Sequence, residues 1–315
     1  MIEYLLFIIS LCMLGLSIYL MRTKEGFALY LLKIMLSSLF GLGMLFFYYG
    51  AIHGTFILLA ISILAPTLFY TYSKHNYVFG GIILLIYACA GYWLLHYGYT
   101  AIPIIQIFGI GMLISSLPIT SKNEAQSRKN KQLETKRDVA QIIIGIIVLG
   151  TVYFINYNLS LYLVLGYMLF GYMLNSIMAS SNSTIAHVLK GFERNGVMFG
   201  KGALYIGIGT MIILGFISSK DIALASLSAL FISDSVATII GIRTKRKLLY
   251  NKHKSIGGFI GYFISLSAIG YLFIGIYSVP FAFVLAFIES ISSRIDDNIT
   301  IALACFIIYR ILIFL

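Results

Sequence analysis

The segment that decides the fold runs from residue 222 to residue 277 and reads IALASLSALFISDSVATIIGIRTKRKLLYNKHKSIGGFIGYFISLSAIGYLFIGIY. Two long apolar runs are separated by a strongly basic stretch that begins at Arg243 and ends at Lys254. A run of about 20 apolar residues is long enough to cross the hydrocarbon core of a bilayer as an α-helix. The segment therefore predicts two membrane-spanning helices joined by a basic loop.

The rest of the chain has the same apolar character. Of its 315 residues, 60% are hydrophobic and only 10% are charged, and the mean hydropathy is +0.96. This composition excludes an ordinary soluble globule and a disordered chain. We expect an all-α fold, a polytopic transmembrane helix bundle of about 11 to 12 spans. The expected spans are residues 2–21, 27–49, 52–72, 77–95, 100–120, 139–155, 159–179, 202–218, 222–242, 257–277, 279–290 and 299–315.

The longest polar stretch, residues 121–138 (SKNEAQSRKNKQLETKRD), suggests a division of the chain. We expect a transmembrane block of unknown role over residues 1–120, a basic cytoplasmic linker over residues 121–138, and a catalytic transmembrane block over residues 139–315. The segment 279–290 is too short to cross a membrane alone.

The charge distribution predicts the orientation of the chain. Lys and Arg number 22 against 11 Asp and Glu, a formal net charge of +11. Alternating spans place nearly all these cations on one side, which the positive-inside rule makes cytoplasmic. Both termini are then external. Because topology accounts for most of the basic charge, no nucleic-acid partner is expected.

Two acidic residues, Asp234 and Glu289, interrupt or close apolar runs. An ionised carboxylate in mid-membrane costs about 2.5–3.5 kcal/mol on insertion scales, so it needs a partner or a function. A structural hydrogen bond to a neighbouring helix is one explanation, and a functional role is the one we favour. Asp234, Thr238 and Gly241 are spaced i, i+4 and i+7 on one helical face that leads into the basic loop.

The basic loop carries six formal positive charges in the twelve residues from Arg243 to Lys254. This exceeds what topology needs and favours an anionic ligand, such as a phosphate chain or a lipid headgroup, over a merely solvated loop. The loop leads into Ser255-Ile256-Gly257-Gly258, where the first N–H groups of a helix could bind phosphate.

A second group of oxygen ligands follows near the C-terminus, at Glu289, Asp296, Asp297 and Asn298. Hard oxygen ligands beside a phosphate-binding basic loop are what a Mg²⁺-nucleotide site requires. A soluble-type nucleotide fold is not indicated, because residues 196–202 (GVMFGKG) lack the spacing and the Ser/Thr of a P-loop.

These motifs, in this order, resemble those of the CTP-dependent isoprenoid-alcohol kinases, the phytol kinase and dolichol kinase group, over about residues 185–312. Asp234, Ala237 and Gly241 are similar to the family's Asp-x-x-Ala-x-x-x-Gly helix. Residues 247–258 resemble its loop ending in Asn-x-x-Lys-Ser-x-x-Gly, and Glu289-Ser290 with residues 296–300 resemble its Glu-Ser and Asp-Asp-Asn-Leu-Thr motifs. The chain departs from the family at Ser233, commonly Gly, and at Gly257, often Glu.

The resemblance implies transfer of the γ-phosphoryl of CTP to the hydroxyl of a prenyl alcohol of the phytol, geranylgeraniol or dolichol type. The reaction would take place at the cytoplasmic face of the membrane, and Mg²⁺ would be the cofactor. A nucleoside triphosphate, a long-chain isoprenoid alcohol and membrane lipids would be the partners. The choice of CTP rests on the resemblance alone.

The resemblance and the chemistry together give each candidate residue a role. Glu289 is the candidate base or base-orienting group, because it is the acid nearest to a buried alcohol. The catalytic candidates are Asp234, Glu289 and Asp297; the metal ligands are Asp234, Asp296, Asp297 and Asn298; and the nucleotide-binding residues are Gly241, Arg243, Arg246, Asn251, Lys254, Ser255, Gly257 and Gly258.

Two other classes of protein would also place acids and cations at a membrane face. One is a cytidylyltransferase, which makes a CDP-lipid and releases pyrophosphate rather than CDP. The other is a transporter or flippase whose buried acids carry ions, and which would be indifferent to CTP.

Overall fold

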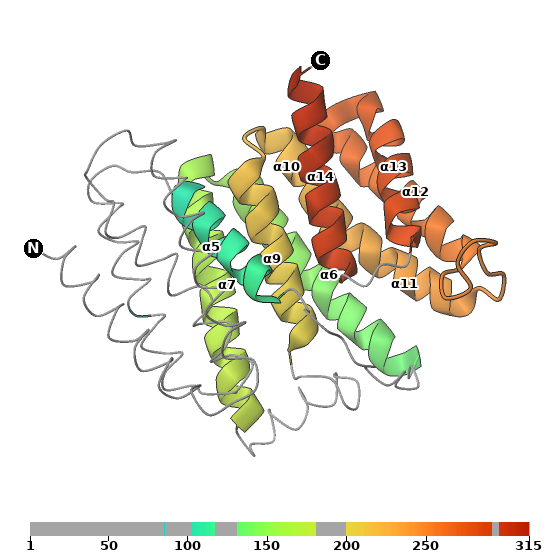
Figure 1. Cartoon of the computed structure of the whole chain (residues 1–315), viewed down its shortest axis with the longest axis horizontal. Helices are drawn as coiled ribbons and strands as arrows, with labels where there is room; N and C mark the ends of the chain where they lie inside the picture. The colour runs from blue at the N-terminus through green and yellow to red at the C-terminus, as the bar shows by residue number, and fades with distance from the viewer. Residues whose placement is uncertain (1–84, 86–101, 117–130, 181–199, 292–295, 315) are drawn as a thin grey trace, which may run out of the picture. The chain divides into compact units, whose positions relative to one another are not determined.

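The computed structural model describes residues 85, 102–116, 131–180, 200–291 and 296–314 (Figure 1). These residues are helical apart from short connections and one isolated antiparallel bridge, between Lys247 and Ser255. The all-α prediction is confirmed for this part of the chain. The first four expected spans, apart from residue 85, lie outside it. The helices are α5 (Ile102–Ser116), α6 (Lys131–Phe154), α7 (Tyr157–Ser180), α9 (Lys201–Phe216), α10 (Lys220–Ser228), the π-helix η1 (Ala229–Ser233), α11 (Asp234–Arg243), α12 (Ile256–Ile274), the 3-10 turn η2 (Gly275–Tyr277), α13 (Ser278–Ser290) and α14 (Asp297–Phe314).

Three helical stretches in the described residues are long and apolar enough to cross a membrane. They are Glu134–Phe154, Lys220–Arg243 and Ile256–Ser290. Two shorter apolar helices are Ile104–Ile114 and Gly202–Phe216. The expectation of membrane-spanning helices is therefore met in its coarse form, while the total of 11 to 12 spans stays a prediction.

The chain divides into two compact units. One comprises residues 1–120 and 165–183, and its described part is α5 with the later turns of α7. The other comprises residues 121–164 and 184–315, and it holds every candidate site residue. In this second unit, residues 131–138 of the expected linker form the first turns of α6. The proposed division at residues 120 and 138 stays a prediction.

Helix α6 runs antiparallel to the stretch formed by α10, η1 and α11. Near one end, Lys220 Nζ donates a hydrogen bond to the carbonyl of Tyr153 (2.9 Å). Further along, Gly145 lies so close to Phe231 that an added Cβ would stand 2.4 Å from the Phe231 Cβ. The two helices therefore approach most closely at a position where α6 has no side chain.

A π-helical turn, Ala229–Ser233, separates α10 from α11. A π-turn disturbs the regular i→i−4 hydrogen bonding, and such turns recur at functional sites. Here Gln141 Nε2 on α6 donates to the carbonyl of Leu230 at 3.0 Å. The sequence predicts one uninterrupted helix over residues 222–242, and the structure differs by inserting this turn immediately before Asp234.

Helices α12 and α13 form an antiparallel hairpin around η2. The Phe263 and Phe283 rings lie 6.2 Å apart, and Ser278 Oγ donates to the carbonyl of Ser267 at 3.0 Å. The beginning of α12 and the end of α13 therefore lie at the same end of the hairpin (Figure 1). This explains the short segment 279–290, which forms, as helix α13, the return arm of the hairpin.

Candidate functional site

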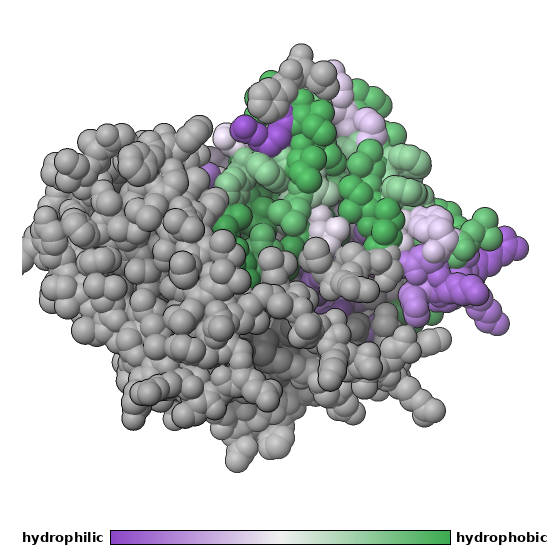
Figure 2. Space-filling view, in the orientation of Figure 1, coloured by the Kyte–Doolittle hydropathy of each residue, from purple (hydrophilic) through white to green (hydrophobic). Residues whose placement is uncertain are grey.

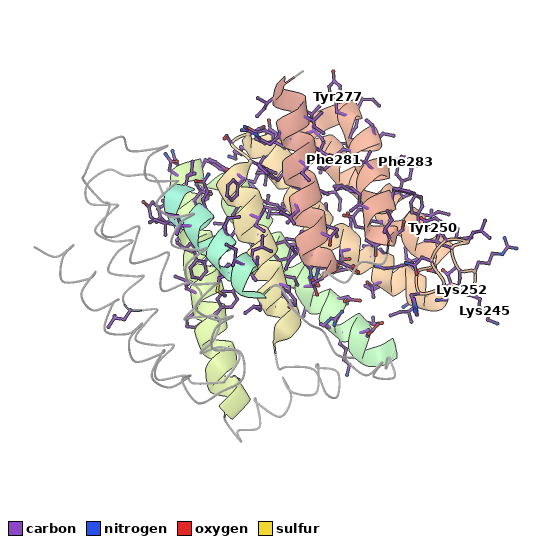
Figure 3. The ribbon with its side chains drawn as sticks, viewed as in Figure 1. Lys245, Tyr250, Lys252, Tyr277, Phe281 and Phe283 are labelled. Carbon is purple, nitrogen blue, oxygen red and sulfur yellow. The ribbon has the colours of Figure 1, made fainter. Side chains whose placement is uncertain are left out.

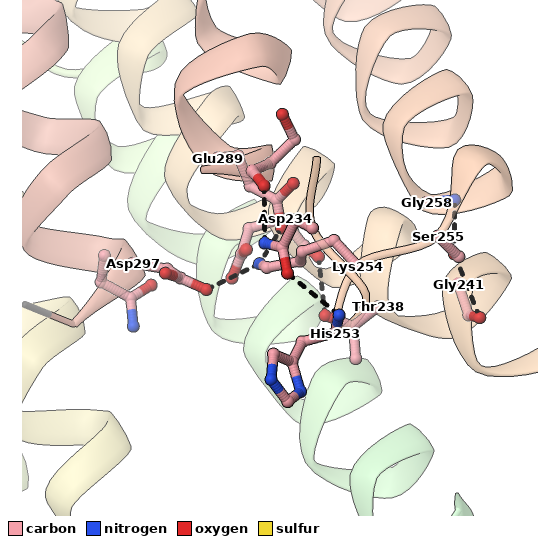
Figure 4. A network of polar contacts seen from close by, with 12 residues as sticks. Asp234, Thr238, Gly241, His253, Lys254, Ser255, Gly258, Glu289 and Asp297 are labelled. Atoms are coloured by element: carbon pink, nitrogen blue, oxygen red, sulfur yellow. Dashed lines mark hydrogen bonds and ion pairs between the residues drawn. The ribbon is translucent and has the colours of Figure 1, made fainter. Parts of the chain in front are cut away.

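The candidate site lies where four segments of the second unit meet, at the open end of the α12–α13 hairpin (Figure 4). Helix α11 contributes its first residue, Asp234, and the loop before α12 contributes Lys254. The last turn of α13 contributes Glu289, and the first turn of α14 contributes Asp297. All four segments carried sequence motifs, and the fold brings them to one place.

Lys254 is the centre of the site. Its Nζ donates to Oδ2 of Asp297 at 2.8 Å and also to Oε1 of Glu289. The Glu289 side chain is 6% exposed, that of Lys254 25%, and that of Asp297 39%. Burial lowers the pKa of Lys254, but the carboxylates of Glu289, Asp297 and Asp234 together raise that pKa above its ordinary value. Lys254 is therefore held as an ammonium ion between two carboxylates.

Asp234 is placed differently from the other two acids. It lies within electrostatic range of Lys254, Glu289 and Asp297. Its carboxylate makes no hydrogen bond or ion pair with any residue that the structure describes, although its backbone carbonyl accepts a bond from Thr238 Oγ1 at 3.1 Å. A carboxylate with no committed partner beside a fixed cation is available to a ligand or a metal ion.

The loop that carries Lys254 is attached to the end of α13. Asn251 Nδ2 donates to the backbone carbonyl of Ser290 at 2.8 Å, and the Tyr250 and Ser290 hydroxyls lie 2.5 Å apart. Within the loop, the amide of Leu248 donates to the carbonyl of Lys254 at 3.1 Å. Asn251, predicted to bind nucleotide, thus has a positioning role in this geometry, because it fixes the loop beside Glu289.

The small residues at the start of α12 have structural roles as well. Ser255 Oγ accepts from the amide of Gly258 at 3.1 Å, as an N-cap does, and donates to the carbonyl of Gly241 at 3.2 Å. A Cβ at Gly258 would lie 3.0 Å from the carbonyl oxygen of Ala237, so α11 and α12 pack closely here. The contribution of Gly241, Ser255 and Gly258 to phosphate binding stays a prediction.

Gly257 has a specific neighbour that accounts for the residue found there. A Cβ at this position would lie 2.1 Å from Oγ1 of Thr244. Any larger residue at position 257 would therefore require Thr244 to move. The close packing of these two residues explains why a glycine stands here.

The predicted metal ligands do not converge as a group of protein side chains. In the described residues, no three His, Cys, Asp or Glu side chains are placed to hold one metal ion. Asp297 is engaged with Lys254, and Asp296 Oδ1 accepts from the backbone and side-chain N–H groups of Asn298 at 3.0 and 2.9 Å. Asn298 Oδ1 is buried and has no hydrogen-bond partner among the described residues.

The donor atoms that remain still suit magnesium brought in with a nucleotide. Mg²⁺ is usually held by one or two carboxylates, water and substrate phosphates rather than by an all-protein cage. The Asp234 carboxylate and the Asn298 amide oxygen are hard oxygen ligands of this kind. The assignment of these residues to a metal site stays a prediction. It requires the phosphates of a bound nucleotide to complete the coordination of Mg²⁺.

Arg243 and Arg246 lie apart from the ion cluster. Both are exposed, and no hydrogen bond or ion pair of their side chains joins them to a described residue. Of the basic residues from Arg243 to Lys254, it is Lys254 that reaches the carboxylates. The phosphate-binding role predicted for the two arginines stays untested in this geometry.

Asp138 is a residue of this region that sequence reasoning missed. Asp138 is 2% exposed, and it lies close enough to Asp234 for the two acids to interact electrostatically. Asp138, Gln141 and Gly145 share one face of α6, at i, i+3 and i+7, and the last two contact η1. The buried face of α6 thus continues, at the same spacing, from its apolar part into the polar residues 131–138. This spacing is the signal from which Asp138 could have been placed on the face that lies beside the site.

Comparison with known proteins adds little to this geometry. No family model matches the chain, and no solved structure matches it. The chain is 44% identical over 102 residues to an uncharacterized protein of Methanocaldococcus jannaschii. The match covers 32% of this chain and 53% of the relative, so the chain spans about half the length of the archaeal protein that it matches.

Proposed function

We propose that this protein is a membrane-embedded kinase that transfers the γ-phosphoryl group of CTP to the hydroxyl of a long-chain isoprenoid alcohol. The observation that carries the proposal is the arrangement of Lys254 between Glu289 and Asp297, with the uncommitted carboxylate of Asp234 beside them. These residues come from the three motifs that resemble the phytol kinase and dolichol kinase group.

The chemistry of phosphoryl transfer suits such a site. Catalysis rests mainly on positioning the reactants and on neutralising charge on the transferred group. Lys254 is a cation that can leave its carboxylates to contact the phosphates of an incoming nucleotide, and Asp234 and Asn298 would hold the Mg²⁺. Magnesium, when bound, supplies further positive charge to the phosphate oxygens.

The acceptor alcohol needs a group that takes its proton. As the alcohol oxygen bonds to the γ-phosphorus, the bond to the β-phosphate oxygen breaks and CDP leaves. Glu289, buried in the last turn of α13, is the candidate acceptor for the hydroxyl proton. If Lys254 turns toward the nucleotide, the Glu289 carboxylate is released from this ion pair and can accept the hydroxyl proton.

Membrane embedding follows from the substrate in this proposal. A long isoprenoid alcohol resides in the bilayer with only its hydroxyl near water. The three helical stretches that are long and apolar enough to cross a membrane support a multi-pass arrangement. The basic loop beside the site supports a cytoplasmic orientation.

Product analysis tests this proposal against the alternatives. Purified protein in bilayers is incubated with CTP, Mg²⁺ and geranylgeraniol, and the released nucleotide is identified. Release of CDP with formation of a prenyl monophosphate supports the kinase. Release of pyrophosphate with formation of a CDP-lipid would establish the cytidylyltransferase, and no CTP consumption with any alcohol would favour the transporter.

A further inference from the structure

The loop between α11 and α12 presents two chemically different sides. Asn251, Lys254 and Ser255 face the helices through the hydrogen bonds described above. The opposite side is exposed, and Leu249 is 101% exposed at its tip. Figure 3 shows Lys245 and Lys252 at the outer edge of this loop. The exposed residues of the loop are Lys245, Arg246, Lys247, Leu249, Tyr250, Lys252 and His253.

The backbone of the loop holds these side chains outward. Lys247 and Ser255 form an antiparallel bridge, in which the amide of Ile256 donates to the carbonyl of Arg246 at 3.1 Å. The Tyr250 hydroxyl is tied to Ser290, as described above. Because both arms of the loop are fixed, the exposure of Leu249 is a property of the fold. A fully exposed leucine close to lysines is typical of a segment that binds a membrane interface, where the leucine enters the apolar zone and the lysines contact the headgroups.

The position of the loop along the hairpin points to the nature of that surface. Exposed apolar side chains of α12 and α13 form a belt that includes Ile256, Ile260, Ile264, Phe283 and Phe287. Figure 2 shows apolar surface over α12, α13 and α14 and hydrophilic surface at the loop. With a rise of 1.5 Å per residue, the 19 residues of α12 extend about 28 Å, close to the thickness of a hydrocarbon core.

Aromatic residues mark both ends of this belt. Tyr277 lies in the turn at one end, and Tyr250 lies at the other, with its ring 6.0 Å from that of Phe287 (Figure 3). Both tyrosines are exposed. Tyrosine is enriched at membrane–water interfaces, where its ring lies between the apolar zone and the headgroups. The loop therefore lies at the level of lipid headgroups.

We propose that the exposed side of this loop is a binding surface for anionic membrane lipids. Leu249 inserts among the upper acyl chains, and the ammonium groups of Lys245, Lys247 and Lys252 contact headgroup phosphates. Free nucleotide is a less suitable occupant, because these lysines are exposed whereas Lys254 is the lysine of the loop that pairs with Glu289 and Asp297. An exposed leucine also makes no favourable contact with a phosphate chain. The evidence for this lipid-binding surface does not rest on the kinase activity proposed above.

The surface has a consequence for the site. Asn251 and Tyr250 bind Ser290, the residue after Glu289, so lipid contact on one side of the loop stabilises the position of Lys254 on the other. Each lysine near an anionic surface raises the equilibrium constant for binding of the loop to the membrane by about fivefold. The contact weakens as salt rises, because the Debye length shortens.

The test uses a single tryptophan as a depth probe in the full chain. The chain has one tryptophan, Trp93, so Leu249→Trp is made in a Trp93→Phe background. The protein is reconstituted with lipids brominated near the headgroup, in phosphatidylcholine alone or mixed with phosphatidylglycerol. We expect stronger quenching of the tryptophan at position 249 by the brominated lipid in the phosphatidylglycerol bilayers, and protection there from acrylamide.

The triple variant Lys245→Gln, Lys247→Gln and Lys252→Gln tests the charge requirement. It is combined with Leu249→Trp in the Trp93→Phe background. We expect the quenching of the tryptophan at position 249 to become equal in the two kinds of bilayer. Phe287→Trp in the same Trp93→Phe background is the matched control, because Phe287 is an exposed apolar residue of α13 and should be quenched in both bilayers. Adding Phe287→Trp to the triple lysine variant, in place of Leu249→Trp, shows whether that variant is still inserted in the bilayer.

Two results would overturn the proposal. One is equal exposure of the tryptophan at position 249 to acrylamide in both bilayers while Phe287→Trp is quenched normally. The other is loss of the bilayer difference on adding free CTP, which would assign the lysines to nucleotide. Because no turnover is measured, a negative result here leaves the kinase proposal standing, and absence of kinase activity leaves this result standing.

Discussion

Lys254 and Asp297, which are 43 residues apart in the sequence, form an ion pair with 2.8 Å between Nζ and Oδ2. Lys254 contacts Glu289 at the same time. One side chain therefore joins the loop before α12 to the end of α13 and to the start of α14. The charge that stabilises this junction is also the charge that a phosphate-binding site needs.

Replacing Lys254 tests the structural part of this junction. Lys254→Met leaves the Glu289 carboxylate buried without this cation, and we expect a loss of about 3 kcal/mol in the free energy of unfolding. Adding Glu289→Gln to Lys254→Met removes the uncompensated charge and should recover much of that loss. Thermal unfolding in detergent measures both variants. Equal destabilisation of the single and the double variant would show that the loss of stability does not come from the broken ion pair.

The pH dependence of stability follows from the raised pKa of Lys254. A group whose pKa is higher in the folded state stabilises that state fully below its unfolded pKa, about 10.4 for lysine, and the contribution is lost as pH rises through the folded pKa. The difference in Tm between the wild type and Lys254→Met should thus be constant from about pH 7 to about pH 10 and shrink above that range. A difference that shrinks already below about pH 9 would contradict the placement of Lys254 between two carboxylates.

Asp234→Asn separates function from stability. Since the Asp234 carboxylate makes no hydrogen bond or ion pair with the described residues, the isosteric amide should leave the Tm unchanged or slightly raised. Activity with CTP and a prenyl alcohol should fall by at least about 100-fold, because a ligand of the phosphate-bound cation is lost. Asp221→Asn is the matched control, an exposed acid in the first turn of α10. A large loss of stability in Asp234→Asn would indicate a purely structural acid.

Much of the helical architecture could be predicted from the sequence, because apolar runs long enough to cross a bilayer form α-helices. Expected spans 202–218 and 299–315 correspond to α9 and α14 with boundaries shifted by one to a few residues. The π-turn before Asp234 could not be predicted, and neither could the bond that the Leu230 carbonyl within it accepts from Gln141 of α6. Composition and periodicity carry no information about such a tertiary contact.

The candidate site could be predicted in its members but not in its pairings. The motifs named Lys254, Glu289 and Asp297, and the structure brings them together. The sequence assigned Asp297 to a metal and Lys254 to phosphate, whereas their mutual ion pair depends on the hairpin geometry. Asp138 was missed because the register between two helices fixes its place beside Asp234, and a single sequence does not reveal that register.

Packing between α6 and η1 gives a prediction about stability alone. Gly145→Ala would place a Cβ 2.4 Å from the Phe231 Cβ, and the resulting overpacking should cost about 1–3 kcal/mol. Gly150→Ala on the same helix is the control, because its Cβ would have nothing within 4 Å and helix propensity favours alanine. Denaturant unfolding compares the two variants. If Gly145→Ala were as stable as Gly150→Ala, the close approach of α6 to the π-turn would be refuted.

The most direct measurement of the central claim is transfer of radiolabelled phosphate from γ-labelled CTP to an isoprenoid alcohol by the reconstituted protein. Alcohols of graded chain length are compared, with ATP as the competing donor and Asp234→Asn as the inactive reference. The account predicts labelled prenyl monophosphate from the wild type with CTP and almost none from Asp234→Asn. Equal labelling by both proteins, or no labelled lipid from the wild type with any donor and alcohol, would contradict it.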